Sequence, residues 1–255
     1  MTLRSLQKWH GAGNDFLIDV VSEHDAPWWN PSHASAVCRR ATGVGADGLI
    51  VATLGSTVAM VLYNADGSVA EMSGNGIRCM AAAVRRATKG EWSSLEVLTV
   101  AGPREVSLEM DGDHGYGGVA MGRVTFARNQ EGAVGVVNVG NPHVVVEDKP
   151  SWPDVQREAM AERMSSFEGG ANVEFVTVVD RGNLAMRVIE RGVGWTLACG
   201  TGSYAAAAVF HREGRCDADV VVDNPGGPLR VVIEGDEATL SGPVQFVADV
   251  EWLEV

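Results

Sequence analysis

Cys199 lies in the segment Leu197–Gly202 (Leu-Ala-Cys-Gly-Thr-Gly), directly before the alanine-rich stretch Ser203–Ala208. Glycine permits positive φ angles and lets a ligand approach the backbone closely. The start of a helix offers unpaired N–H groups and the positive end of the helix dipole, which together suit a carboxylate. The same surroundings lower the pKa of a thiol. We therefore expect Cys199 to act as an acid/base group on an amino-acid α-carbon.

A second segment repeats this pattern about half the chain earlier. Ser73-Gly74-Asn75-Gly76 precedes an alanine-containing helical pattern, as Cys199-Gly200-Thr201-Gly202 does. Two such helix starts facing one substrate would clamp its carboxylate and stabilise the enolate-like charge formed when the α-proton leaves. The plainer interpretation is turn chemistry before each helix, with Cys199 as a small buried hydrophobe. Spacing alone does not name a reaction.

Five asparagines stand in turn-like or strand-end positions: Asn14, Asn64, Asn75, Asn141 and Asn172. Asparagine suits turns, but its amide also both donates and accepts hydrogen bonds, which suits a zwitterionic ligand. Arg191, after Glu190, could hold a carboxylate in bidentate fashion, or it could be a solvated strand end.

The elements that must position these residues are mostly strands. Helical patterns cover Ser32–Arg40 with Ser32 as N-cap, Ile77–Lys89 with Gly90 as stop, Trp152–Met164, and Thr201–Arg212 ended by Gly214. Strand patterns cover Thr57–Tyr63, Leu95–Val100, Val134–Val139, Val144–Val146, Phe175–Val179, Leu184–Ile189, Val220–Val222 and Leu229–Ile233. This is an α+β pattern without regular βαβ alternation.

Composition excludes several classes of partner. The net charge of −13 and the scattered arginines argue against nucleic acid. No apolar stretch approaches a membrane span of roughly 20 residues, and the N-terminus lacks a signal-peptide core, so we expect a cytoplasmic protein without a membrane partner. The four cysteines have no CxxC spacing, which argues against a zinc site.

Several motifs together resemble the diaminopimelate epimerases, which are cofactor-independent amino-acid epimerases. The resemblance runs along essentially the whole chain, in order. It is carried by the segments 10–16 (HGAGNDF), 43–48 (GVGADG), 64–68 (NADGS), 73–79 (SGNGIRC), 140–143 (GNPH), 171–174 (ANVE), 190–194 (ERGVG), 198–202 (ACGTG) and 225–227 (PGG).

The resemblance implies two similar lobes, each a barrel-like sheet around a central helix, with the active site in the cleft between them. The N-terminal lobe would span 1–123 and be joined by the strand 247–255, and the C-terminal lobe would span 124–246. One residue would remove the α-proton while another protonates the opposite face. Neither a cofactor nor a metal is implied. The resemblance implies a diamino dicarboxylic acid as substrate, LL-2,6-diaminopimelate, which would be converted to its meso isomer in lysine biosynthesis, and a homodimer is compatible with it.

The resemblance also carries residue roles. Cys199 matches a catalytic cysteine, and Glu190 and His143 match residues that assist catalysis. Backbone amides that bind the carboxylate match Gly74, Asn75, Gly200 and Thr201. Substrate-holding side chains match Asn14, Asn64, Asn141, Asn172 and Arg191.

The chain departs from the family at Ser73, where the second catalytic cysteine normally stands. A serine hydroxyl is a far poorer base than a thiol. Ser73 could act as a weak or water-assisted partner, or Cys79 could be recruited by a local shift, although it lies about 1.5 helical turns away and is expected to be packed. Alternatively, the chain could be a related racemase, isomerase or one-sided dehydratase, or a catalytically silent amino-acid-binding protein.

Overall fold

The computed structural model describes residues 3–70, 72–128, 130–165 and 170–253. The chain forms two compact units, Met1–Val119 with Gly242–Val255, and Ala120–Ser241. The first is called unit 1 and the second unit 2. The chain changes from unit 1 to unit 2 within β8 (His114–Arg123), between residues 119 and 120, and returns within β17 (Glu237–Leu253), between residues 241 and 242. The resemblance implied that these changes lie at 123/124 and 246/247.

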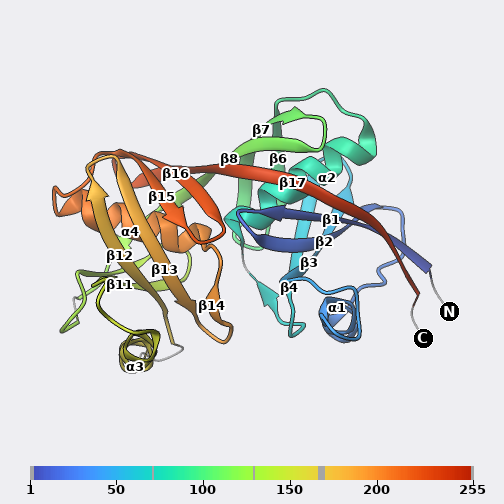
Figure 1. The fold of residues 1–255 in the computed structure, drawn as a ribbon. Coiled ribbons are helices and arrows are strands. Elements are labelled where there is room, and N and C mark those ends of the chain that lie inside the picture. The colour runs from blue at the N-terminus through green and yellow to red at the C-terminus, as the bar shows by residue number, and fades with distance from the viewer. Residues whose placement is uncertain (1–2, 71, 129, 166–169, 254–255) are drawn as a thin grey trace. The chain divides into compact units, whose positions relative to one another are not determined.

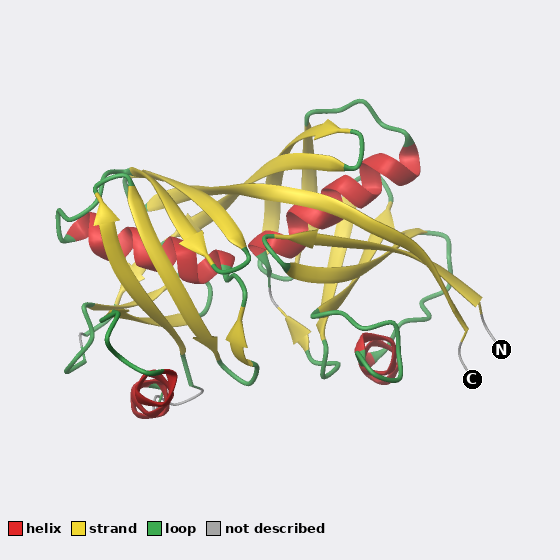
Figure 2. Ribbon diagram, in the orientation of Figure 1, coloured by secondary structure: helices red, strands yellow, loops and turns green. Residues whose placement is uncertain are grey.

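Unit 1 consists of strands around the helix α2 (Gly74–Thr88), which contacts β1, β2, β3 and β7 (Figures 1 and 2). Its other elements are β1 (Leu3–Gly11), β2 (Asn14–Ser22), α1 (Pro31–Cys38), β3 (Gly48–Leu54), β4 (Val58–Asn64), β5 (Val69–Ala70), β6 (Ser94–Thr99) and β7 (Gly102–Asp111). The end of β17 pairs antiparallel with β1.

Unit 2 repeats this plan around the helix α4 (Gly200–Arg212), which contacts β10 to β13, β15 and β16 (Figure 2). Its other elements are β9 (Thr125–Phe126), β10 (Gly135–Asn138), β11 (Pro142–Glu147), α3 (Asp154–Met164), β12 (Asn172–Asp180), β13 (Asn183–Glu190), β14 (Gly194–Thr196), β15 (Asp219–Asn224) and β16 (Gly227–Glu234). The expected α+β fold of two similar lobes, each with a sheet around a central helix, is confirmed.

Small side chains explain why α2 and α4 can be central. Nearly every residue of α4 from Gly200 to Phe210 is buried, as is every residue of α2 from Gly74 to Val84. Both helices are mostly apolar where the strands surround them, although α2 also buries Asn75 and Arg78. The runs Ala81–Ala83 and Ala205–Ala208 let strands approach the helices closely. The sequence pattern had predicted both helices.

One helix start differs from the prediction. Asn30, not Ser32, caps α1, because the Asn30 side-chain oxygen accepts hydrogen bonds from the backbone N–H groups of Ser32 and His33 (2.9 and 3.0 Å). Ser32 instead lies in the first turn. The predicted end of α2 agrees with the structure: Lys89 is the C-cap, in the left-handed conformation (φ 53°). Gly90, the predicted stop, follows it and donates its N–H to the Arg85 carbonyl.

None of the helices in the described part of the chain has the length and apolar character needed to cross a membrane.

Candidate active site

Cys199 and Ser73 occupy the same local position in the two units. Each is the N-cap of the central helix, with closely similar backbone angles (φ −126°, ψ 116° for Cys199; φ −138°, ψ 121° for Ser73). The Cys199 Sγ accepts the Gly202 N–H at 3.3 Å, and the Ser73 Oγ accepts the Gly76 N–H at 3.0 Å. The repeated sequence pattern thus reflects a repeated structure.

Each helix start leaves two backbone donors available. These donors are the N–H groups of Gly74 and Asn75 in α2 and of Gly200 and Thr201 in α4. They lie in the first turn, where an N–H has no carbonyl partner within its own helix. No acceptor for them is found among the described residues. Paired N–H groups at the positive end of a helix dipole suit an anionic oxygen. These four N–H groups are the ones that the resemblance predicts to bind a carboxylate, two in each unit.

The surroundings of Cys199 contradict one expectation. We expected the helix start to lower the pKa of the thiol, but burial raises the pKa of Cys199 well above its ordinary value, and the carboxylates of Glu190 and Glu174 raise it further. Hydrogen bonds from Thr201 and Gly202 oppose this shift and are outweighed. Since only 5% of Cys199 is exposed, desolvation of a thiolate exceeds the helix contribution. The resting group is a thiol, ready to donate a proton.

Glu190, at the end of β13, is the group next to this thiol. Its carboxylate accepts hydrogen bonds from the Thr196 hydroxyl (2.5 Å) and from the Cys199 thiol, and both lower its pKa. Burial raises the pKa more strongly, so the net direction is upward. A carboxylate with a raised pKa beside a protonated thiol can take up the thiol proton.

His143 and Glu174 form a fully buried pair close to the start of α4. The His143 Nδ1 lies 2.6 Å from the Glu174 Oε1, and its Nε2 lies 2.8 Å from the Asn141 Oδ1. A Cβ atom added at Gly202 would meet the Glu174 Oε1 at 2.8 Å, so the glycine lets the helix pack against this carboxylate. The structure thereby brings Asn141 and His143 together with the Cys199 group.

Glu174 was not predicted as a site residue, although it lies in the motif 171–174 with the predicted Asn172. The two lie on β12 two positions apart, so their side chains share one face of the strand, and that spacing was the available signal. Asn172 itself is buried and accepts the Arg191 backbone N–H at 2.9 Å through its side-chain oxygen.

Unit 1 holds its asparagines in a separate group. The Asn75 amide donates to the Asn14 Oδ1 at 3.4 Å, and the Asn14 amide donates to the Asp47 Oδ2 at 2.8 Å. Asn64 ends β4, at the same end of the sheet as Asn14, but it is exposed; its side-chain amide donates to the Ser68 hydroxyl and its backbone N–H donates to the Ser68 carbonyl. The contacts of Asn64 are those of an ordinary turn.

Cys79 is packed, as expected. It is fully buried within α2, and burial raises the pKa of its thiol to about 12. Its Sγ would lie 3.5 Å from a Cβ at Gly11, so the thiol faces β1 rather than the helix start.

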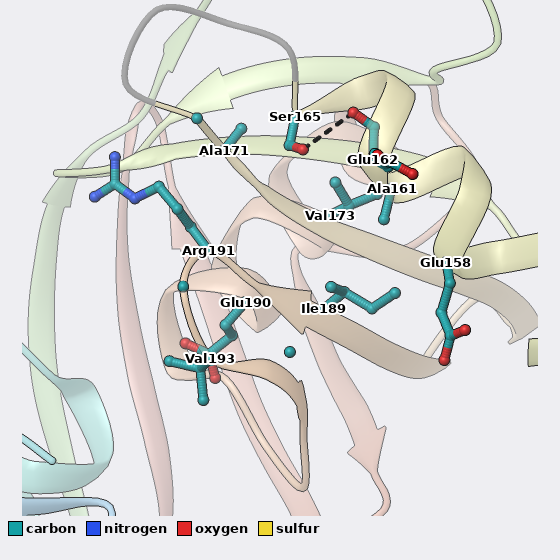
Figure 3. Close-up of a pocket in the computed structure, with 13 residues that line it drawn as sticks. Glu158, Ala161, Glu162, Ser165, Ala171, Val173, Ile189, Glu190, Arg191 and Val193 are labelled. Carbon is teal, nitrogen blue, oxygen red and sulfur yellow. Dashed lines mark hydrogen bonds between the residues drawn. The ribbon is translucent and has the colours of Figure 1, made fainter. Parts of the chain in front are cut away.

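A pocket of about 490 Å³ opens beside the Cys199 group in unit 2 (Figure 3). Glu190 and Arg191 lie on one side of it, and Glu158 and Glu162 of α3 lie on the other (Figure 3). The pocket therefore has Glu190 in common with the Cys199 group, but neither Cys199 nor His143 belongs to its lining.

Comparison with known proteins places this arrangement in a family. The diaminopimelate epimerase family model matches residues 6–127 and 135–247. Diaminopimelate epimerases from Xanthomonas campestris and Clostridium perfringens are 38% and 32% identical to this chain; the alignments cover 96% of this chain and 95% and 98% of those relatives.

Solved structures share the fold at lower identity. A predicted epimerase from Pseudomonas aeruginosa has a TM-score of 0.77 at 15% identity, covering 99% of this chain and all of the other. A probable proline racemase from Agrobacterium radiobacter has a TM-score of 0.73 at 13% identity, covering 98% of this chain and 92% of the other. The match of the family model and of these relatives over nearly the whole length shows that the chain belongs to the diaminopimelate epimerase family, a family of isomerases.

Proposed function

We propose that this protein converts LL-2,6-diaminopimelate to the meso isomer by removing the proton from one α-carbon and protonating the opposite face. The observation that carries the proposal is the buried Cys199 thiol at the start of α4, beside two unpaired backbone donors and hydrogen-bonded to Glu190. The relatives that bear the diaminopimelate epimerase name support this substrate.

In the proposed mechanism Cys199 acts first as an acid. Its raised pKa keeps the proton on sulfur, and the thiol gives that proton to the α-carbon after deprotonation on the opposite face. In the reverse direction Glu190 takes up the thiol proton, and the thiolate removes the α-proton. The N–H groups of Gly200 and Thr201 hold the carboxylate and stabilise the charge that moves onto it.

Ser73 is proposed to serve the other face, together with the backbone donors of Gly74 and Asn75. A hydroxyl is a weak base, so this face is expected to be slow unless water assists. The burial of Cys79 and the direction of its thiol argue against its recruitment. We expect the two stereoisomers to lose their α-protons at unequal rates.

The remaining residues are proposed to hold the substrate. Amide side chains and the Arg191 guanidinium match the two carboxylates and two ammonium groups of diaminopimelate. His143 and Glu174 are proposed to assist the Cys199 group. The substrate-holding set consists of Asn14, Asn64, Asn141, Asn172 and Arg191.

Solvent-deuterium exchange, started separately from each stereoisomer, tests the proposal. We expect deuterium at Cα from both isomers, with a slower rate for the isomer whose proton faces Ser73. Absence of exchange from both isomers, with binding retained, would leave an amino-acid-binding protein. Exchange accompanied by loss of a substituent would identify a one-sided eliminating enzyme.

Two further properties are proposed. Free thiols at all four cysteines favour a reducing compartment such as the cytoplasm. A homodimer is supported by Leu3 and Leu253, which oppose each other on β1 and β17 and are both exposed. Sedimentation measurements would test the dimer.

A further inference from the structure

Arg78 is a buried cation that the proposed mechanism does not use. It lies on α2, four residues after Gly74, and none of its surface is exposed. Its guanidinium donates to the Gly74 carbonyl (2.7 Å) and to the Asn75 Oδ1 (2.9 Å). Burial lowers its pKa to about 10, which leaves it charged at neutral pH. Within the described residues no carboxylate forms an ion pair with it. A buried charge without a partner is costly, so this arginine needs an explanation.

A chain of hydrogen bonds leads from Arg78 to a carboxylate. The Asn75 amide, whose oxygen accepts from Arg78, donates to the Asn14 Oδ1, and the Asn14 amide donates to the Asp47 Oδ2. Asp47 is held in turn by Arg40, whose guanidinium donates to the Asp47 Oδ1 at 2.7 Å. We call Arg78, Asn75, Asn14 and Asp47 the amide relay. All four belong to unit 1.

The two ends of the amide relay determine its direction. An arginine side chain only donates hydrogen bonds, and an ionised aspartate only accepts them, whereas an asparagine amide could be turned either way. Because Arg78 occupies the oxygen of Asn75, the nitrogen of Asn75 must face Asn14. Because Asp47 occupies one N–H of Asn14, the oxygen of Asn14 must face Asn75. Reversing either amide would set donor against donor or acceptor against acceptor.

This orientation leaves one N–H on each asparagine outside the relay. A ligand near Asn14 and Asn75 would therefore meet amide donors, together with the backbone N–H groups of Gly74 and Asn75. A carboxylate, which only accepts, matches this set. A bound carboxylate would also bring a negative charge near Arg78, which has no carboxylate partner among the described residues.

We propose that Arg78 and Asp47 are positioning residues, which orient Asn75 and Asn14 so that both present N–H donors to a carboxylate of the substrate. The inference rests on the proposed function, because it assumes that diaminopimelate binds at the start of α2.

Steady-state kinetics of Asp47→Asn with diaminopimelate test the proposal. The substitution keeps the shape of the side chain but allows it to donate, so Asn14 is no longer held in one orientation. The variant would lose a hydrogen bond from the Asn14 amide to the substrate carboxylate, both in the substrate complex and in the transition state. We therefore expect KM to rise roughly 10-fold, with kcat changed much less. Asp47→Glu, which still only accepts, should restore most of the affinity.

Asp249→Asn is the matched control. Asp249 is also an exposed carboxylate paired with an arginine, since Arg86 donates to both of its oxygens (2.7 and 2.8 Å), but it lies outside the relay. Its KM should equal that of the parent. Thermal unfolding of all variants separates a general loss of stability from a change in binding.

Arg78→Lys tests the relay from its other end and serves if Asp47→Asn does not fold. A lysine ammonium cannot reproduce the planar pair of bonds to Gly74 and Asn75, so KM should rise here too. A KM within twofold of the parent in both variants, or an equal rise in Asp249→Asn, overturns the proposal. If the parent itself exchanges no α-proton, the proposed function fails instead, and the relay is then judged by diaminopimelate binding to the same variants in calorimetry.

Discussion

The buried position of Cys199 determines the resting charge of its thiol. In the proposed mechanism this thiol reaches a substrate carbon, and its surroundings keep it protonated. Cys199→Ala removes the proton donor on one face, and we expect the rate of epimerisation to fall roughly 10²–10⁴-fold. Cys216→Ala removes another buried thiol of unit 2, whose Sγ contacts the Ala207 carbonyl, and should leave the rate close to that of the parent. Equal rates for Cys199→Ala and the parent would contradict the role of the thiol.

At Ser73 a thiol can be added instead of removed, because Ser73 is the N-cap of α2 in unit 1 as Cys199 is the N-cap of α4 in unit 2. Ser73→Cys supplies a second thiol without moving the backbone, and the nearby N–H of Gly76 remains as a hydrogen-bond donor. We expect a faster epimerisation and a smaller difference between the exchange rates of the two stereoisomers. A rate that stays unchanged would mean that proton transfer at Ser73 does not limit turnover.

Glu190 is expected to control the acidic limb of the pH profile. Burial raises its pKa above the ordinary value of 4.5, and only the carboxylate can accept the thiol proton. The value of kcat/KM should therefore fall as the pH drops through this raised pKa. Glu190→Gln should abolish that limb and lower the rate roughly 10²-fold.

The same pKa shift has a consequence for stability. The folded protein binds the Glu190 proton more tightly than the unfolded chain does. The protonated acid therefore contributes to the free energy of unfolding at pH values below the unfolded pKa, and this contribution is lost as the pH rises through the folded pKa. At neutral pH, Glu190→Gln should therefore unfold at a higher denaturant concentration than the parent, while near pH 4 the two should be alike. Lower stability of the variant at neutral pH would contradict a buried, unfavourable carboxylate.

At the scale of elements, the start of α1 shows how local hydrogen bonds determine which residue caps a helix. Asn30→Ala removes the acceptor of two backbone N–H groups and should lower the free energy of unfolding by about 1 kcal/mol. Ser32→Ala changes the residue that the sequence pattern favoured as cap, and the change should lie within about 0.5 kcal/mol of the parent. Urea denaturation of both variants decides which residue caps the helix.

Elements with a strong local signal were predictable. The β-branched runs became β4, β6, β10 to β13, β15 and β16, and the alanine-rich patterns became α2 and α4. Strand β17 was only partly foreseen, since Gly242 and Pro243 are typical of a turn and yet lie inside a strand of 17 residues. Its pairing with β1, at the far end of the chain, supplies a contact that no local pattern contains.

At the scale of the whole molecule, the repeated helix starts and the motif series indicated the family, the two-lobed fold and the position of Cys199. The charge of the thiol could not be predicted in this way. It depends first on the burial of the thiol and then on Glu190 and Glu174, and both arise only after β12, β13 and α4 have packed. The cap at Asn30 and the direction of the amide relay likewise depend on which side chains meet in space. The sequence therefore identified the candidate site residues, but it did not show which charges and hydrogen-bond partners surround them in the fold.

Binding and chemistry should separate when the stability of the whole protein is measured with ligand. A ligand that binds only the folded state adds about 2.7 kcal/mol at 100 times its Kd, which for a chain of this size raises the unfolding midpoint by roughly 5–10 °C. We expect diaminopimelate to produce this shift in the parent and equally in Cys199→Ala, because the backbone donors and amide side chains remain. Pimelate, which has the same two carboxylates and no ammonium groups, should shift the midpoint less. A Cys199→Ala protein that loses both turnover and the thermal shift would mean that the thiol is needed for binding, and the assignment of Cys199 as an acid/base group would no longer follow from the loss of activity.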